Sequence, residues 1–522
     1  MQLFPFDLPA REKLGKQIFS LAPTPELFRT RKDRRQEMRS LVLLVAACLA
    51  LTAHASGEKK IVCYMGGWAV YRPGLGKFNI EDIQPQLCTH LIYTFVGLVG
   101  NDIKVLDAWQ DLPDNWGKDA FGRFNALRKL SPSTKTLIAI GGWNEGSQKY
   151  SQMASSAKSR SEFVANAVAF TKKHNFDGFD LDWEYPAQRG GSPADVQNFV
   201  ALVKEMREAF DKEGLLLTAA VGAAKSSASQ SYDIPQISKY LHFINLMTYD
   251  LHGSWEPQTG INAPLYPAAS ETGLSRELTV DACVKYWLAQ GVDPEKLVLG
   301  VASYGRTFTL ANPSNNGVGA PTQGPGSAGP YTRESGFYGY NEICDMQSSA
   351  EWTVVFDKER RCPYAYNGKQ WVGYDNVESI KEKAEYAKKM GLGGAMIWSI
   401  ETDDFRGKCG ESYPLIKTLN HVLRNGVQVS ERPTLPPRST EAPATGASSP
   451  VTEGPQPTTP ETVNNSGDCK APGNIPDPNN SSQFFQCVPQ ADAGYTRITV
   501  PCAHGLVFNP SAGICDWKSS SY

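Results

Sequence analysis

Three carboxylic acids stand at alternate positions in one short segment, at Asp180, Asp182 and Glu184. Side chains alternate across a β-strand, so in a strand all three acids point to one side. Solvated acids on an exposed face are a poor alternative, because the interleaved residues are large and apolar: Phe179, Leu181 and Trp183. Like charges buried together raise one another's pKa. We therefore expect Asp182 to hold Glu184 protonated by repulsion and proton sharing, as a general acid requires.

Eight short apolar runs must position these acids. The runs span residues 61–64, 90–95, 136–140, 176–183, 215–221, 241–247, 297–303 and 394–398. Amphipathic stretches such as 161–174 and 196–213 separate several of them, which is typical of buried parallel strands with crossover helices. We predict an α/β fold, a (β/α)8 TIM barrel, with an open doubly wound sheet as the alternative. Glu184 then lies at the carboxyl-end mouth, where barrels keep their active sites.

The long gap between the seventh and eighth runs indicates an insertion. About residues 304–391 separate them, and this stretch contains strand-like pieces of its own, for instance at 353–356. We interpret it as a small α+β lobe within a catalytic barrel of residues 58–425.

The N-terminal region carries a targeting signal. An apolar run at 41–53 follows five basic residues, and small residues follow it, so 38–55 is interpreted as a secretory signal peptide. The run is shorter than the roughly 20 residues that span a bilayer, which leaves a signal anchor as the weaker alternative. Residues 1–37 precede Met38 and are an extension whose status is left open. We expect a secreted protein with no membrane partner after signal removal.

The C-terminal region changes composition twice. Residues 428–466 are rich in Pro, Thr and Ser and are interpreted as an extended linker. Residues 467–522 hold four cysteines and several aromatics, which indicates a small disulfide-stapled β-rich module. Cys48 leaves with the signal, so ten of the 11 cysteines remain, an even number that suits an oxidising compartment.

Composition and charge restrict the partners. The formal net charge is −2, so nothing points to nucleic acid. No cysteine or histidine cluster has zinc spacing, and we expect neither metal nor cofactor. The aromatic fraction of 10%, with 11 Trp, suits a surface that stacks on the apolar faces of sugar rings, although most of these aromatics fill the core in any large domain.

Several segments resemble those of family 18 glycoside hydrolases, the chitinases, over about residues 58–425. The segment from Asp177 to Pro186 looks like the Asp-x-x-Asp-x-Asp-x-Glu signature of the fourth strand. Ile140-Gly141-Gly142-Trp143 resembles the third-strand motif, and Met247-Thr248-Tyr249-Asp250 the sixth. Tyr304-Gly305-Arg306 resembles the seventh, and Trp398 the indole of the eighth strand.

The resemblance implies the catalytic roles. Glu184 protonates the glycosidic oxygen, and the nucleophile is the acetamido oxygen of the substrate itself, since this family departs from the two-carboxylate rule. Asp182 stabilises the positive nitrogen, Asp180 supports Asp182, and Tyr249 hydrogen-bonds the acetamido carbonyl. Further substrate-binding residues are implied at Tyr64, Trp68, Trp143, Met247, Asp250, Trp255, Arg306, Glu334 and Trp398. For the tryptophans at 68, 143 and 255 the rival is core packing, and for Arg306 and Glu334 it is a surface ion pair.

The resemblance also implies disulfides. In the barrel these are Cys63–Cys88 and Cys344–Cys409, and Cys283 and Cys362 are left unassigned. The C-terminal module resembles a peritrophin-A type chitin-binding domain that lacks one bridge, with Ser481 at one lost position and Cys469–Cys487 and Cys502–Cys515 remaining. A cysteine-stapled module without sugar affinity is the alternative.

We therefore expect a monomeric, secreted endochitinase that hydrolyses β-1,4 bonds of chitin and chito-oligosaccharides with retention of configuration. One alternative is a chitin-binding lectin or growth-factor-like relative, which usually replaces the terminal acid that is present here as Glu184. The other is a hydrolase of other N-acetylglucosamine glycans.

Overall fold

A computed structural model describes residues 58–349, 351–425, 473–489, 495–502, 506–509 and 514–517. The chain divides into two units, Met1–Pro437 and Arg438–Tyr522. The predicted signal peptide and the whole of the predicted linker lie outside the described residues. Within the described residues, no helix is long and apolar enough to cross a membrane.

Eight parallel strands form the core of the first unit, and they close into a barrel because β1 pairs with both β2 and β15. The strands are β1 (Lys60–Gly66), β2 (His90–Val99), β4 (Lys135–Gly141), β5 (Gly178–Asp182), β6 (Leu216–Gly222), β7 (Phe243–Met247), β8 (Leu297–Ala302) and β15 (Gly394–Trp398). Each predicted run forms one of these strands. The closed barrel, rather than an open sheet, is thereby confirmed. A short β3 (Asp102–Val105) pairs antiparallel with β2.

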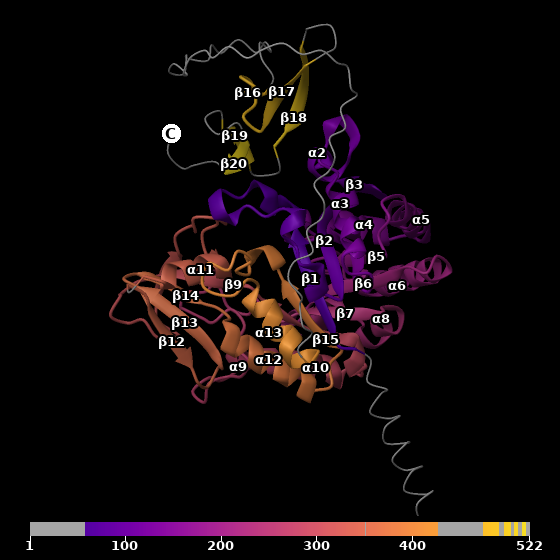
Figure 1. Cartoon of the computed structure of the whole chain (residues 1–522). Helices are drawn as coiled ribbons and strands as arrows, with labels where there is room; N and C mark the ends of the chain where they lie inside the picture. The colour runs from indigo at the N-terminus through magenta and orange to yellow at the C-terminus, as the bar shows by residue number, and fades with distance from the viewer. Residues whose placement is uncertain are drawn as a thin grey trace, which may run out of the picture. The chain divides into compact units, whose positions relative to one another are not determined.

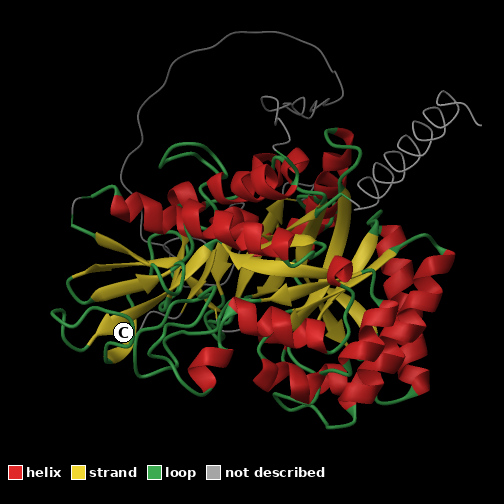
Figure 2. Cartoon of the chain, turned by 90° about the horizontal axis from the view of Figure 1, so that it is seen from below, coloured by secondary structure: helices red, strands yellow, loops and turns green. Residues whose placement is uncertain are grey.

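Helices surround this barrel (Figures 1 and 2). They are α2 (Ala108–Asp111), α3 (Ala120–Ala126), α4 (Gln148–Ala154), α5 (Ala157–Lys173), α6 (Asp195–Lys212), α7 (Lys225–Ser231), α8 (Ile234–Tyr240), α9 (Leu274–Glu277), α10 (Val280–Ala289), α12 (Val377–Lys389) and α13 (Pro414–Leu423). Side-chain caps start several of them: Ser156 accepts from the Ser159 amide at α5, and Asn376 from the Ser379 amide at α12. Because helices cover the strands, both faces of a strand such as β8 are buried.

The α+β insertion between β8 and β15 forms a second sheet. It contains β9 (Tyr304–Leu310), β10 (Thr322–Pro325), β11 (Phe337–Gly339), α11 (Tyr340–Gln347), β12 (Thr353–Asp357), β13 (Cys362–Asn367) and β14 (Gln370–Gly373). The strand order is β10-β9-β14-β13-β12, and β11 also pairs with β9. Phe308 and Trp371 meet edge to face in its small core, with ring centroids 5.5 Å apart. A single residue, Ser303, separates β8 from β9.

The cysteines of the first unit fall into two classes. Disulfides join Cys63 to Cys88 and Cys344 to Cys409. Cys283 and Cys362, which the sequence left unassigned, are free and buried. Burial raises the thiol pKa of each to about 12, so both are held as unreactive thiols.

The second unit is β-rich. β16 (Gly473–Pro476), β17 (Gln483–Pro489) and β18 (Tyr495–Pro501) form an antiparallel sheet, and β19 (Leu506–Asn509) pairs with β20 (Ile514–Trp517). The rings of Phe484 and Phe508 stack at 4.8 Å. Cys487 and Cys502 are each disulfide-bonded. Their predicted partners, Cys469 and the side chain of Cys515, lie outside the described residues, so those two pairings stay predictions.

Candidate active site

The three acids come from β5 and the two residues after it. The apolar residues that alternate with the acids point outward and hold β5 against the helices. Phe179 packs edge to face on Phe163 of α5 and Phe210 of α6. Trp183 packs against Phe199 of α6, and its indole nitrogen donates to the Ser147 hydroxyl at 2.9 Å. The alternation predicted from the sequence is therefore present, with apolar side chains against the helices and acids toward the barrel interior.

Asp180 is fully buried and is held by three hydrogen-bond donors. Its carboxylate accepts from the Tyr64 hydroxyl at 2.7 Å, from the Asn245 amide at 3.3 Å and from the Thr218 hydroxyl. Burial raises the pKa of Asp180 to about 6, and the three hydrogen bonds oppose the rise. Sequence reasoning missed Thr218 and Asn245. The available signal was a polar residue inside each of two otherwise mostly apolar runs, 215–221 and 241–247.

Asp182 lies one alternation nearer the mouth and is 3% exposed. Its Oδ1 is buried and has no hydrogen-bond partner among the described residues. Burial, followed by the charges of Glu184 and Asp180, raises its pKa well above the ordinary value. A buried acceptor without a partner costs free energy, which a donor brought by a ligand would recover.

Glu184 follows the end of β5 at the mouth and is partly buried. Burial raises its pKa to about 7, a hydrogen bond from Tyr185 opposes the rise, and the charge of Asp250 adds to it. We expected repulsion by Asp182 to be the main cause. Burial is larger, and the repulsion within the pair appears chiefly as the raised pKa of the deeper Asp182. Whichever cause is larger, Asp182 and Glu184 together retain a proton near neutral pH.

Tyr249 and Asp250 follow β7, whose last residue is Met247. The Tyr249 hydroxyl is buried, and its described contact is a weak one with the Met396 sulfur at 3.6 Å. Asp250 adopts a left-handed backbone, φ 55°, and its amide donates to Asn262 Oδ1 at 2.8 Å. This turn is uncommon for a residue with a side chain, so the surrounding bonds must hold it. It places the carboxylate 2.6 Å from Arg306 Nε.

Aromatic side chains extend from these acids along the mouth. Trp398, at the end of β15, lies 5.5 Å from Tyr64 and 6.3 Å from Trp68, measured between ring centroids. Trp68 is 45% exposed and stacks on Phe95, which sequence reasoning missed. Tyr64, by contrast, is 1% exposed and its hydroxyl is engaged by Asp180, so it lies beneath the surface that a ligand would reach.

Two further tryptophans are exposed, and each makes a cation–π contact with an arginine. Trp143 is 58% exposed, with the Arg189 guanidinium 3.5 Å above its ring. The same guanidinium donates to the Glu184 carbonyl oxygen at 2.9 Å. Trp255 is 60% exposed and lies 5.3 Å from Arg306. Core packing is therefore excluded for Trp68, Trp143 and Trp255, because each of these indoles is exposed.

The last predicted position, Glu334, is exposed on the inserted lobe. Partial burial raises its pKa, and the nearby Arg306 cation opposes the rise. Arg306 therefore bonds Asp250, which follows β7, and also lies near the charge of Glu334 on the lobe, which places the lobe at the wall of the site.

The described part of the chain holds one tight group of potential metal ligands, at Cys344, Asp404 and Cys409. Its two sulfurs are joined in a disulfide and are not available to an ion. The mouth of the barrel instead combines a proton donor, a buried acceptor without a partner, a hydroxyl with only a weak partner, and exposed indoles. That set can protonate a leaving group and bind a polar substituent beside sugar rings.

Comparisons with known proteins agree with this geometry. The family described as Glycosyl hydrolases family 18 matches residues 60–403, and Chitin binding Peritrophin-A domain matches residues 469–522. Chitotriosidase-1 of Mus musculus is 39% identical over 470 residues, covering 88% of this chain and 95% of its own. Endochitinase of Manduca sexta is 35% identical over 550 residues, covering 92% and 98%. A solved structure of Ostrinia furnacalis Group IV chitinase in complex with allosamidin is 48% identical, with TM-score 0.69, covering 71% and 100%.

Proposed function

The chain belongs to family 18 of the glycosyl hydrolases, and we propose that it is a secreted, monomeric endochitinase that uses the substrate's acetamido group as its nucleophile. The barrel cuts β-1,4 bonds between N-acetylglucosamine units, and the C-terminal module holds the enzyme on the polymer. Such an anchor raises the local enzyme concentration on an insoluble substrate.

The orphaned Oδ1 of Asp182 is the observation that supports this mechanism most directly. An acetamido group brings an N–H donor that would satisfy this acceptor, and its carbonyl oxygen can accept from the hydroxyl of Tyr249. With both ends of the amide held, the carbonyl oxygen is directed at the anomeric carbon. A sugar without the acetyl group has no carbonyl oxygen to accept from Tyr249 or to attack the anomeric carbon.

The proposed reaction has two steps. Glu184 gives its proton to the glycosidic oxygen while the acetamido oxygen attacks C1, so the C1–O bond to the leaving sugar breaks and an oxazolinium ion forms. Asp182 stabilises the positive nitrogen by accepting its N–H. Glu184 then takes a proton from a water molecule, whose oxygen attacks C1. This attack breaks the bond between C1 and the acetamido oxygen, so the oxazolinium ring opens and the acetamido group is restored. Two displacements on one carbon retain the anomeric configuration.

The remaining residues position the polymer. Trp398 is the floor of the central sugar site, and Trp68, Trp143 and Trp255 extend stacking surfaces along the mouth. Asp250 bonds the sugar beside the cut and is held in place by Arg306. Arg306 and Glu334 also bind the polymer from the inserted lobe. Tyr64 and Asp180 act through Asp182, since both are buried beneath it.

Hydrolysis of colloidal chitin by the mature chain tests the proposal. We expect turnover by the wild type, loss of at least 10³-fold in Glu184→Gln, and no change in Glu208→Gln, an exposed acid on α6. Proton NMR of products from a chitohexaose should show the β-anomer first. Binding to chitin without turnover would support the lectin alternative. Faster release of N-linked glycans than of chitin fragments would support the other hydrolase.

A fully deacetylated polymer of glucosamine provides the matched substrate control. It has the same backbone and linkage but offers no acetamido oxygen, and therefore no internal nucleophile. Cleavage of this polymer at a rate near that of chitin would contradict substrate assistance while leaving glycosidase activity intact.

A further inference from the structure

Three basic side chains that the proposed mechanism does not use lie at the amino-terminal end of the barrel strands, opposite the mouth that holds Glu184. Lys60, His90 and Lys135 are the first residues of β1, β2 and β4, which are adjacent strands. Parallel strands begin at one edge, so the pairing itself brings the three side chains together. The ring of His90 also meets Phe243, the first residue of β7, at 4.9 Å.

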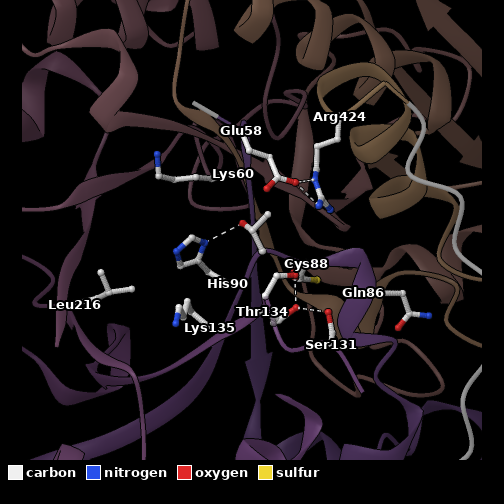
Figure 3. Close-up of a pocket in the computed structure, with 12 residues that line it drawn as sticks. Glu58, Lys60, Gln86, Cys88, His90, Ser131, Thr134, Lys135, Leu216 and Arg424 are labelled. Atoms are coloured by element: carbon white, nitrogen blue, oxygen red, sulfur yellow. Dashed lines mark hydrogen bonds and ion pairs between the residues drawn. The ribbon is translucent and has the colours of Figure 1, made fainter. Parts of the chain in front are cut away.

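A pocket of about 320 Å³ opens among these residues. Figure 3 shows His90 between Lys60 and Lys135, with Leu216 beside them. Serine and threonine hydroxyls line another part of the wall, including Ser133 and Thr134. The volume is at the lower end of the range for small-molecule sites, about 300–1,000 Å³.

The nearby carboxylates already have partners. Three ion pairs account for them: Glu58–Arg424, Asp177–Arg128 and Lys59–Glu295. A fourth acid, Asp293, accepts from the backbone amide of Glu295. Among the described residues, by contrast, neither Lys60 nor Lys135 has a hydrogen-bond or ion-pair partner for its ammonium group, and Lys60 lies 5.7 Å from the Phe243 ring.

The charges of this pocket are therefore unbalanced. Burial, followed by the charges of Lys60 and Lys135, lowers the pKa of His90 to about 3, so the imidazole stays neutral between two cations. Burial also lowers the pKa of Lys60. Burial is the larger cause of both shifts, and the nearby acids Glu295, Asp293 and Asp177 offset only part of them. A bound anion would offset more of this cost.

We propose that this pocket binds a small multivalent oxyanion of the phosphate or sulfate type, with the ammonium groups of Lys60 and Lys135 as its two charged ligands. The hydroxyls of Ser131 and Ser133, which also line the pocket, complete the donor set. Charge-assisted N–H···O bonds from two lysines are roughly twice as strong as neutral ones. Because the pocket is at the opposite end of the barrel, the site is separate from chitin hydrolysis.

Isothermal titration calorimetry of the mature chain at pH 7 tests the site. Sodium phosphate and sodium sulfate are separate probes, and sodium chloride at matched ionic strength is the reference. The test variant is Lys60→Gln with Lys135→Gln. The matched control is Lys358→Gln with Lys369→Gln, two exposed lysines of the inserted lobe, which changes the net charge equally. We also include Lys60→Arg with Lys135→Arg, which keeps both charges.

We expect the wild type, the control and the arginine variant to bind phosphate or sulfate beyond the chloride reference, and the glutamine variant to bind at least tenfold more weakly. Chitin hydrolysis without added oxyanion should be equal in all four proteins, which also shows that each is folded. Absence of oxyanion-specific binding to the wild type overturns the proposal. Equal weakening in the control variant also overturns it, since binding would then follow net charge alone.

Discussion

Replacing Tyr64 by Phe separates two roles for this side chain. Its hydroxyl donates to Asp180 at 2.7 Å and accepts from Asn245 at 2.8 Å, and its ring is 1% exposed. If Tyr64 positions the acids, the change should lower kcat. If it binds sugar directly, the change should raise KM. We expect a fall in kcat of about tenfold, equivalent to about 1.4 kcal/mol, with KM nearly unchanged.

The magnitude of the stability effect depends on the charge of Asp180. Folding raises the pKa of this carboxyl from 3.8 to about 6, so its contribution to stability is fully present below pH 4 and is lost as the pH rises through 6. The Tyr64 hydroxyl offsets part of that loss. A hydrogen bond to an ionised group contributes about 1.5–3 kcal/mol, and one to a neutral group about 0.5–1.5 kcal/mol. Tyr64→Phe should therefore destabilise the fold by about 1 kcal/mol more at pH 8 than at pH 5.

Urea unfolding of the mature chain at both pH values, together with steady-state kinetics on a chito-oligosaccharide, measures these effects. Tyr413→Phe is the matched control, because that buried hydroxyl donates to a neutral acceptor, the carbonyl oxygen of Asp82, at 2.5 Å. Its cost should be similar at both pH values. A pH-independent cost for Tyr64→Phe, or a rise in KM without a fall in kcat, would refute the reasoning.

Three further predictions concern the acids and one ion pair. The pH profile of kcat/KM should fall above about pH 7, because Glu184 must be protonated to act and its pKa is raised to about 7; a constant rate from pH 6 to pH 9 would contradict this. Asp182→Asn should lower kcat by about 10²–10³-fold, the usual loss for a group that stabilises transition-state charge, with chitin binding retained in a pull-down assay. Lys383→Met should destabilise the fold by about 3–5 kcal/mol in urea unfolding, because it leaves the fully buried Asp375 without its cation, and the double variant with Asp375→Leu should recover part of the loss.

The barrel was predictable because its strands have buried faces on both sides. Residues 297–302, for example, have no polar side chain, as a parallel strand covered by helices requires. The inserted lobe was predictable as a unit but not in its strand order. Its antiparallel pairs, such as β9 with β14, join segments about 60 residues apart, and local sequence carries no information on such pairings.

The site was predictable where a motif stands on a single strand. Asp180, Asp182 and Glu184 share one side because of the two-residue period of β5. The bonds around them come from other strands: Thr218 is on β6, Asn245 on β7 and Tyr64 on β1. Their convergence depends on the register of the closed barrel. For the same reason, Tyr64 was assigned to the substrate surface although it lies beneath that surface.

Both connections between the lobe and the barrel are short and buried. On one side only Ser303 separates β8 from β9, and its hydroxyl donates to the Ser399 carbonyl oxygen at 2.6 Å. On the other side three residues join β14 to α12, and Asp375 among them is tied to Lys383. Neither link offers the free backbone torsions of a hinge. The wall that carries Glu334 and Arg306 is thus held firmly to the barrel, and a polysaccharide meets a binding surface of fixed geometry. Selectivity for chain length must then arise from how many sugar rings this surface contacts, and not from a clamp that closes upon them.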